Sequence, residues 1–365
     1  MHRIAWLPGD GIGQEVCDAA RSVLDAAGFE AEYVHGDIGW EFWRQEGEAL
    51  PTRTIELMRS TSCAFFGAIT SKPVSEAQRE LAPELQGKGL SYRSPIVRMR
   101  QLLDLYVCLR PCRAFPGNPL NYRDDIDLVV FRENTEGMYI GVEYARVPES
   151  FRPVKGMDRI ALDAAISIRS VTRRASGRIV RAAFEYAVKH GRRRVTAVHK
   201  ANVLRATCGL FLESAQEVAA EYPQIEFDTA NVDAMCMWLV KNPQNYDVIV
   251  TTNLFGDILS DLCAQLVGGM GFGYSGNIGD HYAVFEPTHG SAPKYAGMSK
   301  VNPLASILAA KMMLDWLGES GAAARVEQAV EEVVRRGEVR TYDMGGSATT
   351  AQMAAAVAEA CAALR

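Results

Sequence analysis

A buried strand that runs directly into a helix carrying two carboxylates is the feature that most constrains how this chain folds. Residues 246–250 have the apolar, β-branched composition of a buried strand, and a helix is expected to begin near Asn253. Asp257 and Asp261 are four residues apart, which places both on one face of that helix. Because ligands of α/β proteins bind where strands give way to helices, we expect the two carboxylates to hold Mg²⁺ or Mn²⁺. The alternative is that Asp257 caps the helix and Asp261 is a solvated acid of its first turn.

The rest of the chain alternates short apolar strands with helices, as α/β proteins do. Strands are expected at residues 4–7, 64–67, 127–131, 195–199 and 283–285, and helices at residues 14–27, 94–105, 201–221, 303–317 and after residue 347. Polar residues follow several of these strands, so functional side chains should cluster at strand ends. The glycine-rich residues 268–280 are expected to form either a flexible crossing or a rigid set of turns.

Composition narrows the class of protein and its compartment. With 365 residues, of which 48% are hydrophobic, the chain can bury a large core and is expected to form two lobes. Its 39 basic and 44 acidic side chains give a net charge of −5, which argues against nucleic acid or a membrane as the main partner. The eight cysteines include no CxxC pair, and neither a signal peptide nor an apolar run of about 18 residues is evident. We therefore expect a cytoplasmic protein with reduced thiols.

Three arginines precede the carboxylates in the sequence. Arg100, Arg110 and Arg132 belong to three different expected elements, so their guanidinium groups can converge on one carboxylate or phosphate ligand. Tyr139 and Lys200 also follow expected strands and can exchange protons. Each of these residues alone is more often structural or solvated. Together with the two carboxylates they favour metal-assisted chemistry on a polyanion.

Several motifs occur in an order that resembles one known family. They are GDGIG at residues 9–13, RQLLDLYVCLRP at residues 100–111, RENTEG at residues 132–137, HKAN at residues 199–202 and HGSAP at residues 289–293. With residues 253–261 they resemble the metal-dependent β-decarboxylating dehydrogenases, which include isocitrate, homoisocitrate and 3-isopropylmalate dehydrogenases. The resemblance covers most of the chain. It implies a two-lobed α/β fold of the isopropylmalate dehydrogenase type, with mixed sheets flanked by helices and a protruding arm.

The resemblance also implies a domain organisation. Residues 1–104 and 274–365 would form a large, discontinuous domain on the cofactor side. Residues 105–273 would form a small domain with the metal acids and a dimer arm at about residues 137–163. A homodimer with shared active sites is implied, because the family's metal acid equivalent to Asp233 comes from the partner subunit.

Residue roles follow from the same resemblance. Arg100, Arg110 and Arg132 would hold substrate carboxylates, with Ser94 as a further contact, and Asp233, Asp257 and Asp261 would hold Mg²⁺ or Mn²⁺. Lys200 would take the proton of the substrate hydroxyl, with its pKa lowered by the metal and the arginines. Tyr139 would return a proton to carbon, and neighbouring cations are expected to keep its phenol acidic.

Cofactor binding is not indicated by the GDGIG motif, which lacks the GxGxxG spacing and is interpreted as a tight structural turn. The resemblance places the nicotinamide near Ile69, Thr70 and Asn202, and the adenosine against His289, Gly290, Ser291, Ala292, Pro293 and Asn302. Members that use NAD tend to carry an acidic and an aliphatic residue after this motif, whereas this chain has Lys294 and Tyr295. A cation and a phenol suit a 2′-phosphate and favour NADP over NAD. Tyr342 could be a third contact, but the basic residue expected a turn later is a glycine.

The residues before the arginine block leave the substrate open among 3-substituted malates. Ser94 matches a serine with which isocitrate enzymes contact a carboxylate, whereas Ile96 departs from their pattern and residues 94–97 look like those of fungal homoisocitrate dehydrogenases. Arg93 and Arg98 favour a charged substituent. Isocitrate is therefore expected first, with homoisocitrate, 3-isopropylmalate and a phosphonate analogue as alternatives. A non-catalytic regulatory paralogue and a metal-free 2-hydroxy-acid dehydrogenase are the competing functions.

Overall fold

A ten-stranded mixed sheet runs through the whole molecule in the order β2-β1-β3-β12-β11-β4-β5-β10-β8-β9. The computed structural model describes all residues, Met1–Arg365. The strands of this sheet are β1 (His2–Gly9), β2 (Ala31–His35), β3 (Cys63–Ala68), β4 (Val107–Arg113), β5 (Asp127–Glu133), β8 (Arg194–His199), β9 (Glu226–Asn231), β10 (Val248–Thr251), β11 (Tyr274–Ile278) and β12 (Ala283–Pro287). The α/β class with a large mixed sheet is therefore confirmed.

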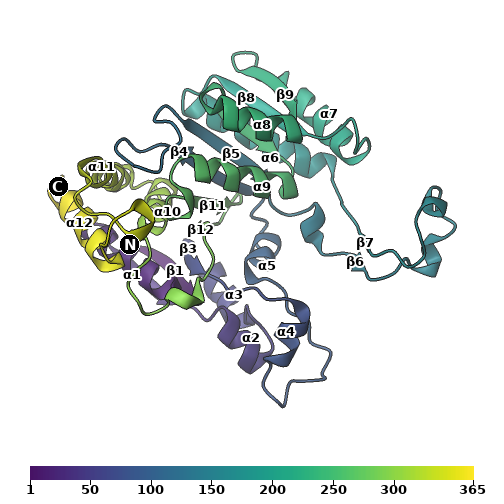
Figure 1. Ribbon diagram of the computed structural model, residues 1–365, viewed down its shortest axis with the longest axis horizontal. Helices are drawn as coiled ribbons and strands as arrows, with labels where there is room; N and C mark the ends of the chain where they lie inside the picture. The colour runs from purple at the N-terminus through teal and green to yellow at the C-terminus, as the bar shows by residue number, and fades with distance from the viewer.

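The chain forms twelve α-helices (Figure 1). They are α1 (Gly13–Ala26), α2 (Trp40–Glu46), α3 (Thr52–Arg59), α4 (Val74–Arg79), α5 (Pro95–Leu102), α6 (Arg173–Lys189), α7 (Thr207–Ala219), α8 (Val232–Lys241), α9 (Asn253–Leu266), α10 (Leu304–Trp316), α11 (Ser320–Arg336) and α12 (Thr350–Ala362). Most of them flank the sheet, whereas α2 and α4 lie together away from it. None of the twelve helices is long and apolar enough to cross a lipid bilayer.

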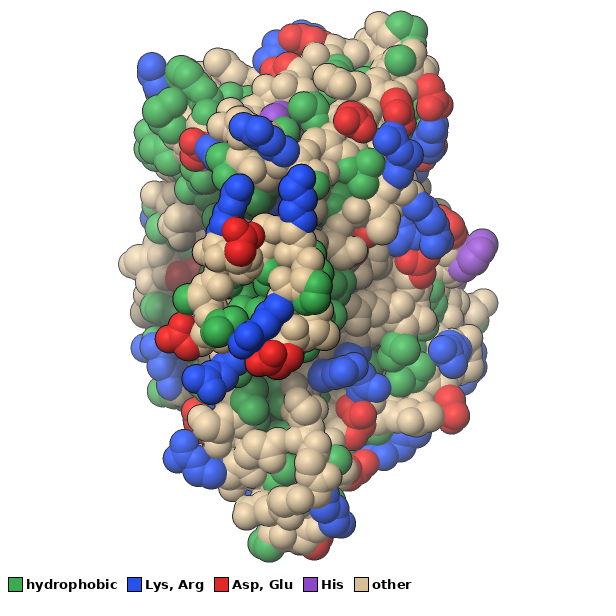
Figure 2. Space-filling model, turned by 90° about the vertical axis from the view of Figure 1, so that its right-hand side faces the viewer, with side chains coloured by type: hydrophobic (Ala, Val, Ile, Leu, Met, Phe, Trp, Pro, Cys, Tyr) green, Lys and Arg blue, Asp and Glu red, His purple; other side chains and the backbone are tan.

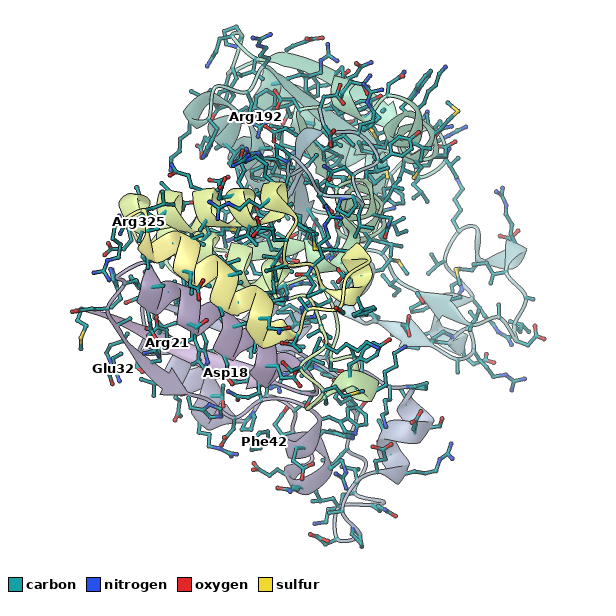
Figure 3. All side chains as sticks on the ribbon, turned by 60° about the vertical axis from the view of Figure 1, so that its left-hand side comes forward. Asp18, Arg21, Glu32, Phe42, Arg192 and Arg325 are labelled. Atoms are coloured by element: carbon teal, nitrogen blue, oxygen red, sulfur yellow. The ribbon has the colours of Figure 1, made fainter.

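Separate hydrophobic cores support the two ends of the sheet. The largest cluster packs α1, α10, α11 and α12 with β1, β3 and β12, and Figure 3 shows α12 lying beside α1 in this lobe. At the other end, Val248 and Val250 of β10 join the cluster under α6, whereas Ile249 joins the cluster under α8 and α9. This alternation is what a strand buried on both faces requires. The proposed domain boundaries at residues 104 and 274 remain a prediction.

The ends of the sheet are parallel and its middle is antiparallel. β11 pairs antiparallel with both β12 and β4, and β4 pairs antiparallel with β5. Beyond this junction, β10 is parallel to both β5 and β8. The carboxyl ends of β5, β8 and β10 therefore lie along one edge, where the following polar residues can meet.

A thin arm projects from the lobe that contains α6 to α9 (Figure 1). It is built around the antiparallel pair β6 (Glu143–Tyr144) and β7 (Ile166–Ser167). Several of its large apolar side chains are exposed, namely Val142, Tyr144, Val154, Ile160 and Leu162. The face seen in Figure 2, toward which the arm points, mixes acidic, basic and hydrophobic side chains.

Three local expectations differ from the structure. The strand expected at residues 246–250 begins only at Val248, because the Tyr246 amide closes a turn onto Pro243 and Asp247 binds the backbone of Arg193. The helix expected at residues 201–221 begins at Thr207, because residues 200–206 form turns. The glycine-rich residues 268–280 contain β11, in which a Cβ on Gly276 would lie 2.7 Å from the Met312 sulfur.

Candidate active site

The two carboxylates of α9 lie where β10 ends. The helix is preceded by Thr252 at the N-cap position, so Asp257 is the fifth helical residue and does not cap it. Asp257 and Asp261 project from successive turns, with 36% and 50% of their side chains exposed. The interpretation of Asp257 as a helix cap is therefore wrong, and both acids face a partly open site.

Arg132 at the end of β5 is the most deeply buried cation of this site. Only 1% of its side chain is exposed, and it donates hydrogen bonds to the Asp257 carboxylate and, at 2.9 Å, to Asn253 Oδ1. Gly256 makes this approach feasible, since a Cβ there would lie 2.5 Å from Arg132 Cγ. Because Gly256 has no side chain, α9 can pack directly against the aliphatic part of the buried Arg132 side chain.

Arg110 on β4 reaches the same acids from a neighbouring strand. Its Nη1 donates to Ser260 Oγ at 2.7 Å and lies 3.1 Å from Asp261 Oδ1, and its Nη2 lies 3.9 Å from Asp257 Oδ1. Its Nε is buried without a hydrogen-bond partner. Arg110 and Arg132, which were expected to converge on an anionic ligand, thus lie together and pair with the α9 carboxylates in the single chain.

Arg100 lies at the end of α5 and is held by a network that the sequence did not suggest. Its Nη2 lies 3.2 Å from Glu286 Oε1, and its Nε donates to Asn277 Oδ1 at 2.9 Å. Asn134 donates to the same Asn277 oxygen. Glu286 belongs to β12 and directly follows the strand expected at residues 283–285. Asn277 belongs to β11, in the segment expected to be a glycine-rich crossing or a set of turns. Only the interlobe sheet pairing reveals them as partners of Arg100.

The electrostatics of the two acids differ. Burial raises the pKa of Asp257. The charge of Arg132, the hydrogen bond from Tyr139 and the charge of Arg110 lower it by more than burial raises it, so the net shift is downward. For Asp261, burial is the largest effect and raises the pKa, and although Arg110 and Arg132 oppose it, burial together with the Asp257 charge leaves the net shift upward. A cation bound between the two residues would stabilise the charged form of Asp261 beside the charged Asp257.

The donor set fits a hard divalent cation. Asp257 and Asp261 offer carboxylate oxygens from one helix, which suits Mg²⁺ or Mn²⁺. No group of three candidate ligand side chains occurs within the single chain. Asp233 lies elsewhere, at the start of α8, so one chain supplies two of the three predicted metal acids in one place.

Tyr139 lies in the 3₁₀ turn Met138–Ile140 after β5, and its hydroxyl donates to Asp257 Oδ2 at 2.6 Å. The expectation that cations keep this phenol acidic is wrong. Burial and the hydrogen bond to Asp257 raise its pKa, and the nearby Arg132 guanidinium, 5.0 Å from the ring centroid, only partly opposes them. Tyr139 is therefore held protonated, as a proton donor must be before it acts.

Lys200 and Asp233 form their own pair. Lys200 follows β8, and its ammonium donates a hydrogen bond to the Asp233 carboxylate. Neither residue forms a hydrogen bond or ion pair with Tyr139, the three arginines or the α9 acids. The single chain thus presents two separate half-sites: the arginines with Tyr139 and the α9 acids, and the Lys200–Asp233 pair.

The segments expected to bind a cofactor meet next to the first strand. Ile69 and Thr70 follow β3, and Thr70 Oγ1 lies 2.7 Å from Ser291 Oγ in the 289–293 segment. Asn302 donates to Asp343 at 3.0 Å. Burial lowers the pKa of His289. Asn202 lies in the turn after β8 and forms no hydrogen bond to these segments.

Lys294 and Tyr295 belong to a cluster of two cations and two phenols. Lys294 Nζ lies 4.8 Å from the Tyr295 ring centroid. Lys300, which the sequence reading did not single out, lies 5.4 Å and 5.1 Å from the centroids of Tyr295 and Tyr342. The hydrogen bond and charge of Lys294 lower the pKa of Tyr295. Neither lysine forms an ion pair with a carboxylate, so their charge is available to an anionic ligand.

A pH prediction concerns His199, the residue before Lys200. Its Nδ1 accepts the Ala201 amide at 3.0 Å, and burial lowers its pKa below the ordinary value near 6.5. Below that pH the unfolded chain binds the proton more readily than the folded chain does. The free energy of unfolding should therefore fall as pH decreases from about 6.5, with a slope from this group of at most about 1.4 kcal/mol per pH unit.

The measurement is denaturant unfolding between pH 7.5 and 5. His199→Asn, which lacks the titrating ring, should lose part of this slope. His281→Asn, which changes an exposed histidine of the other lobe, should keep it. An unchanged slope in His199→Asn would contradict the prediction.

Comparison with known proteins gives consistent matches over nearly the whole chain. A family model described as isocitrate/isopropylmalate dehydrogenase matches residues 3–357. The isocitrate/homoisocitrate dehydrogenase of Thermus thermophilus is 46% identical over 98% of both chains. The 3-isopropylmalate dehydrogenase of Methanothermobacter thermautotrophicus is 42% identical over 98% of this chain and 97% of its own. The crystal structure of an isocitrate dehydrogenase from Methylococcus capsulatus matches with a TM-score of 0.88, 44% identity and 99% coverage of both chains.

Proposed function

This chain belongs to the isocitrate/isopropylmalate dehydrogenase family of decarboxylating dehydrogenases, and we propose that its own reaction is the oxidative decarboxylation of isocitrate to 2-oxoglutarate and CO₂. The observation that carries the proposal is the convergence of Arg110 and Arg132 on the Asp257 and Asp261 carboxylates. A site that holds both buried guanidinium groups and partly exposed carboxylates suits a polycarboxylate bound together with a divalent cation.

The arginines orient the substrate. Arg110, Arg132 and Arg100 approach from β4, β5 and α5, so they can hold different carboxylates of one small anion. Glu286 and Asn277 fix the Arg100 guanidinium from behind. Asp257 and Asp261 would hold Mg²⁺ or Mn²⁺. A cation held there would supply Lewis acidity toward the C2 oxygen of the substrate, and a bound dinucleotide would supply the acceptor for the C2 hydride.

Protons are handled from two sides. Lys200 would remove the proton of the C2 hydroxyl, and loss of CO₂ from the β-carbon would follow oxidation at C2. Tyr139, kept protonated beside Asp257, would then deliver a proton to that carbon. Lys200 forms no hydrogen bond or ion pair with Tyr139 in the single chain, and its partner Asp233 is the acid that the resemblance assigns to the other subunit, so we propose that the Lys200 of each site comes from a second copy.

A homodimer with shared sites would meet this requirement. Met237 and Val240 of α8 and Ile258 of α9 are 55%, 46% and 54% exposed, although they flank the elements that carry Asp233 and Asp257. A clustered exposure of large apolar side chains marks an interaction surface. We propose that two copies pair through α8, α9 and the arm, so that Lys200 and Asp233 of one copy complete the site of the other.

Isocitrate is favoured among the 3-substituted malates by Ser94. This residue occupies the N-cap position of α5, yet its side chain makes no capping hydrogen bond, so its hydroxyl is available to a substrate carboxylate. Arg98 supports the choice less than its charge suggests, because it donates to Glu48 and to the Leu50 carbonyl. Arg93 is exposed and forms no ion pair. Homoisocitrate, which is one carbon longer, is the second candidate, since one Thermus thermophilus relative is named for both substrates.

The test is a steady-state screen of isocitrate, homoisocitrate and 3-isopropylmalate with NADP and NAD. We expect the highest kcat/KM with isocitrate, one CO₂ released per dinucleotide reduced, and loss of activity in EDTA that Mg²⁺ or Mn²⁺ restores. Turnover without CO₂ release or without a metal would favour the simple dehydrogenase. A dimer without turnover on any of the three would favour the regulatory paralogue.

NADP is the proposed cofactor, and the cluster of Lys294, Tyr295, Lys300 and Tyr342 supports it. Lys294→Asp combined with Tyr295→Ile should lower kcat/KM for NADP by at least about 100-fold and change that for NAD much less, because only the 2′-phosphate loses its contacts. Lys189→Asp, at an exposed site of α6, is the charge-matched control. An unchanged NADP-to-NAD ratio would refute this role of the pair.

A further inference from the structure

The GDGIG turn at the end of β1 contacts both segments that the family resemblance assigns to the cofactor. The Asp10 amide donates to the Ala68 carbonyl at 2.9 Å, and the Ile12 amide donates to the Ser291 carbonyl at 2.9 Å. Gly11, with φ of 57°, allows the second contact, since a Cβ there would lie 2.1 Å from the Ser291 oxygen. The turn therefore links the end of β3 to the segment that contains Ser291, although the two are far apart in the sequence.

The Asp10 side chain makes two further hydrogen bonds, and neither of them is part of the turn itself. Its Oδ2 accepts the Thr70 amide at 2.8 Å, and its Oδ1 accepts the Trp40 amide, at the start of α2, at 2.7 Å. The carboxylate is half-buried and forms no ion pair. A half-buried anion whose two oxygens both serve backbone amides fixes those amides in position.

Thr70 is the point on which these contacts converge. Asp10 holds its amide, the Tyr92 hydroxyl donates to its carbonyl at 2.8 Å, and its own hydroxyl lies 2.7 Å from Ser291 Oγ. The amide, carbonyl and hydroxyl of one residue are thus all held from outside its own segment. Such restraint is expected where a ligand must be gripped in one orientation.

We propose that Asp10 is a positioning residue for the nicotinamide end of the cofactor, acting through the Thr70 backbone. The inference rests on the proposed function and on the family resemblance, which places the nicotinamide near residues 69–70 and the adenosine against residues 289–293. The Asp10 side chain binds the first segment directly and reaches the second only through the Thr70–Ser291 contact, whereas the second segment has its own bond to the turn through the Ile12 amide. Loss of the Asp10 carboxylate should therefore affect the two ends of the dinucleotide unequally.

The test is calorimetric titration of Asp10→Asn with two ligands. One is the reduced dinucleotide that the wild-type enzyme uses, and the other is its adenosine diphosphate fragment without nicotinamide, 2′,5′-ADP for NADPH. Asparagine keeps one acceptor oxygen and turns an amide donor toward the other backbone amide. The Kd for the dinucleotide should rise about ten-fold, while the Kd for the fragment stays within about two-fold.

Controls separate positioning from general damage. Asp37→Asn, which weakens an exposed bond to Arg53 in the same lobe, should change neither Kd. Tyr92→Phe removes the other tether of Thr70 while keeping the ring, so it should give the same split even if Asp10→Asn fails to fold. Equal weakening of both ligands, or no weakening of either, would overturn the inference. A wild-type enzyme that binds neither ligand would instead overturn the proposed function and the inference with it.

Discussion

Asp257→Asn is expected to reduce kcat by at least about 10³-fold, since the carboxylate is proposed to be a metal ligand. It is also the hydrogen-bond acceptor of Tyr139 and the charge partner of Arg132. Asparagine retains one oxygen and the shape of the side chain, so the helix should still form. The measurement is steady-state turnover with isocitrate and saturating Mg²⁺ or Mn²⁺, together with a circular dichroism melt.

The control for this variant is Asp25→Asn. Asp25 lies at the exposed end of α1, where it pairs with Arg21, and its loss should leave kcat unchanged. Titration of Mn²⁺ by electron paramagnetic resonance provides a readout independent of turnover, and Asp257→Asn should bind the ion more weakly. Retention of both activity and Mn²⁺ affinity would remove the basis of the proposed metal site.

The part of the site that lies on continuous sequence motifs could be predicted. Asp257 and Asp261 are fixed by helical spacing after a buried strand, and Arg132 by its place at the end of the neighbouring strand β5. These are local patterns whose consequence in three dimensions is set by the parallel pairing of β5 with β10. The α/β class followed from the same alternation of strands and helices.

The part that depends on pairing between distant segments could not be predicted. Glu286 and Asn277 orient Arg100 only because β11 and β12 run antiparallel through the junction of the two lobes. β11 was missed because its residues, YSGNI, include a glycine that makes room for Met312. The phenol of Tyr139 was expected to be acidic because the arginines were counted and the burial and the Asp257 hydrogen bond were not. Side-chain environments of this kind depend on the tertiary structure.

Mixing two inactive variants is expected to restore activity if the site is shared between copies. Lys200→Met removes the proposed base, and Asp257→Asn removes the proposed metal ligand. A dimer with one chain of each kind has one site that combines an intact Asp257 with an intact Lys200 from the other chain, and a second site that lacks both. Because half of the dimers formed by random pairing are mixed, activity should recover to about a quarter of the wild-type value.

The outcome distinguishes a shared site from one within a single chain. If Lys200 served the Asp257 of its own chain, every site in the mixture would lack one of the two groups, and no activity would return. The experiment requires that the chains exchange, which mass spectrometry of differently tagged variants can establish before turnover is measured. A control mixture of Lys200→Met with Asp25→Asn, which leaves Lys200 and Asp257 intact in the second chain, should show at least the activity contributed by that chain. Recovery of activity in the mixture of Lys200→Met and Asp257→Asn, above that of either variant alone, would support the proposed sharing of the site between copies.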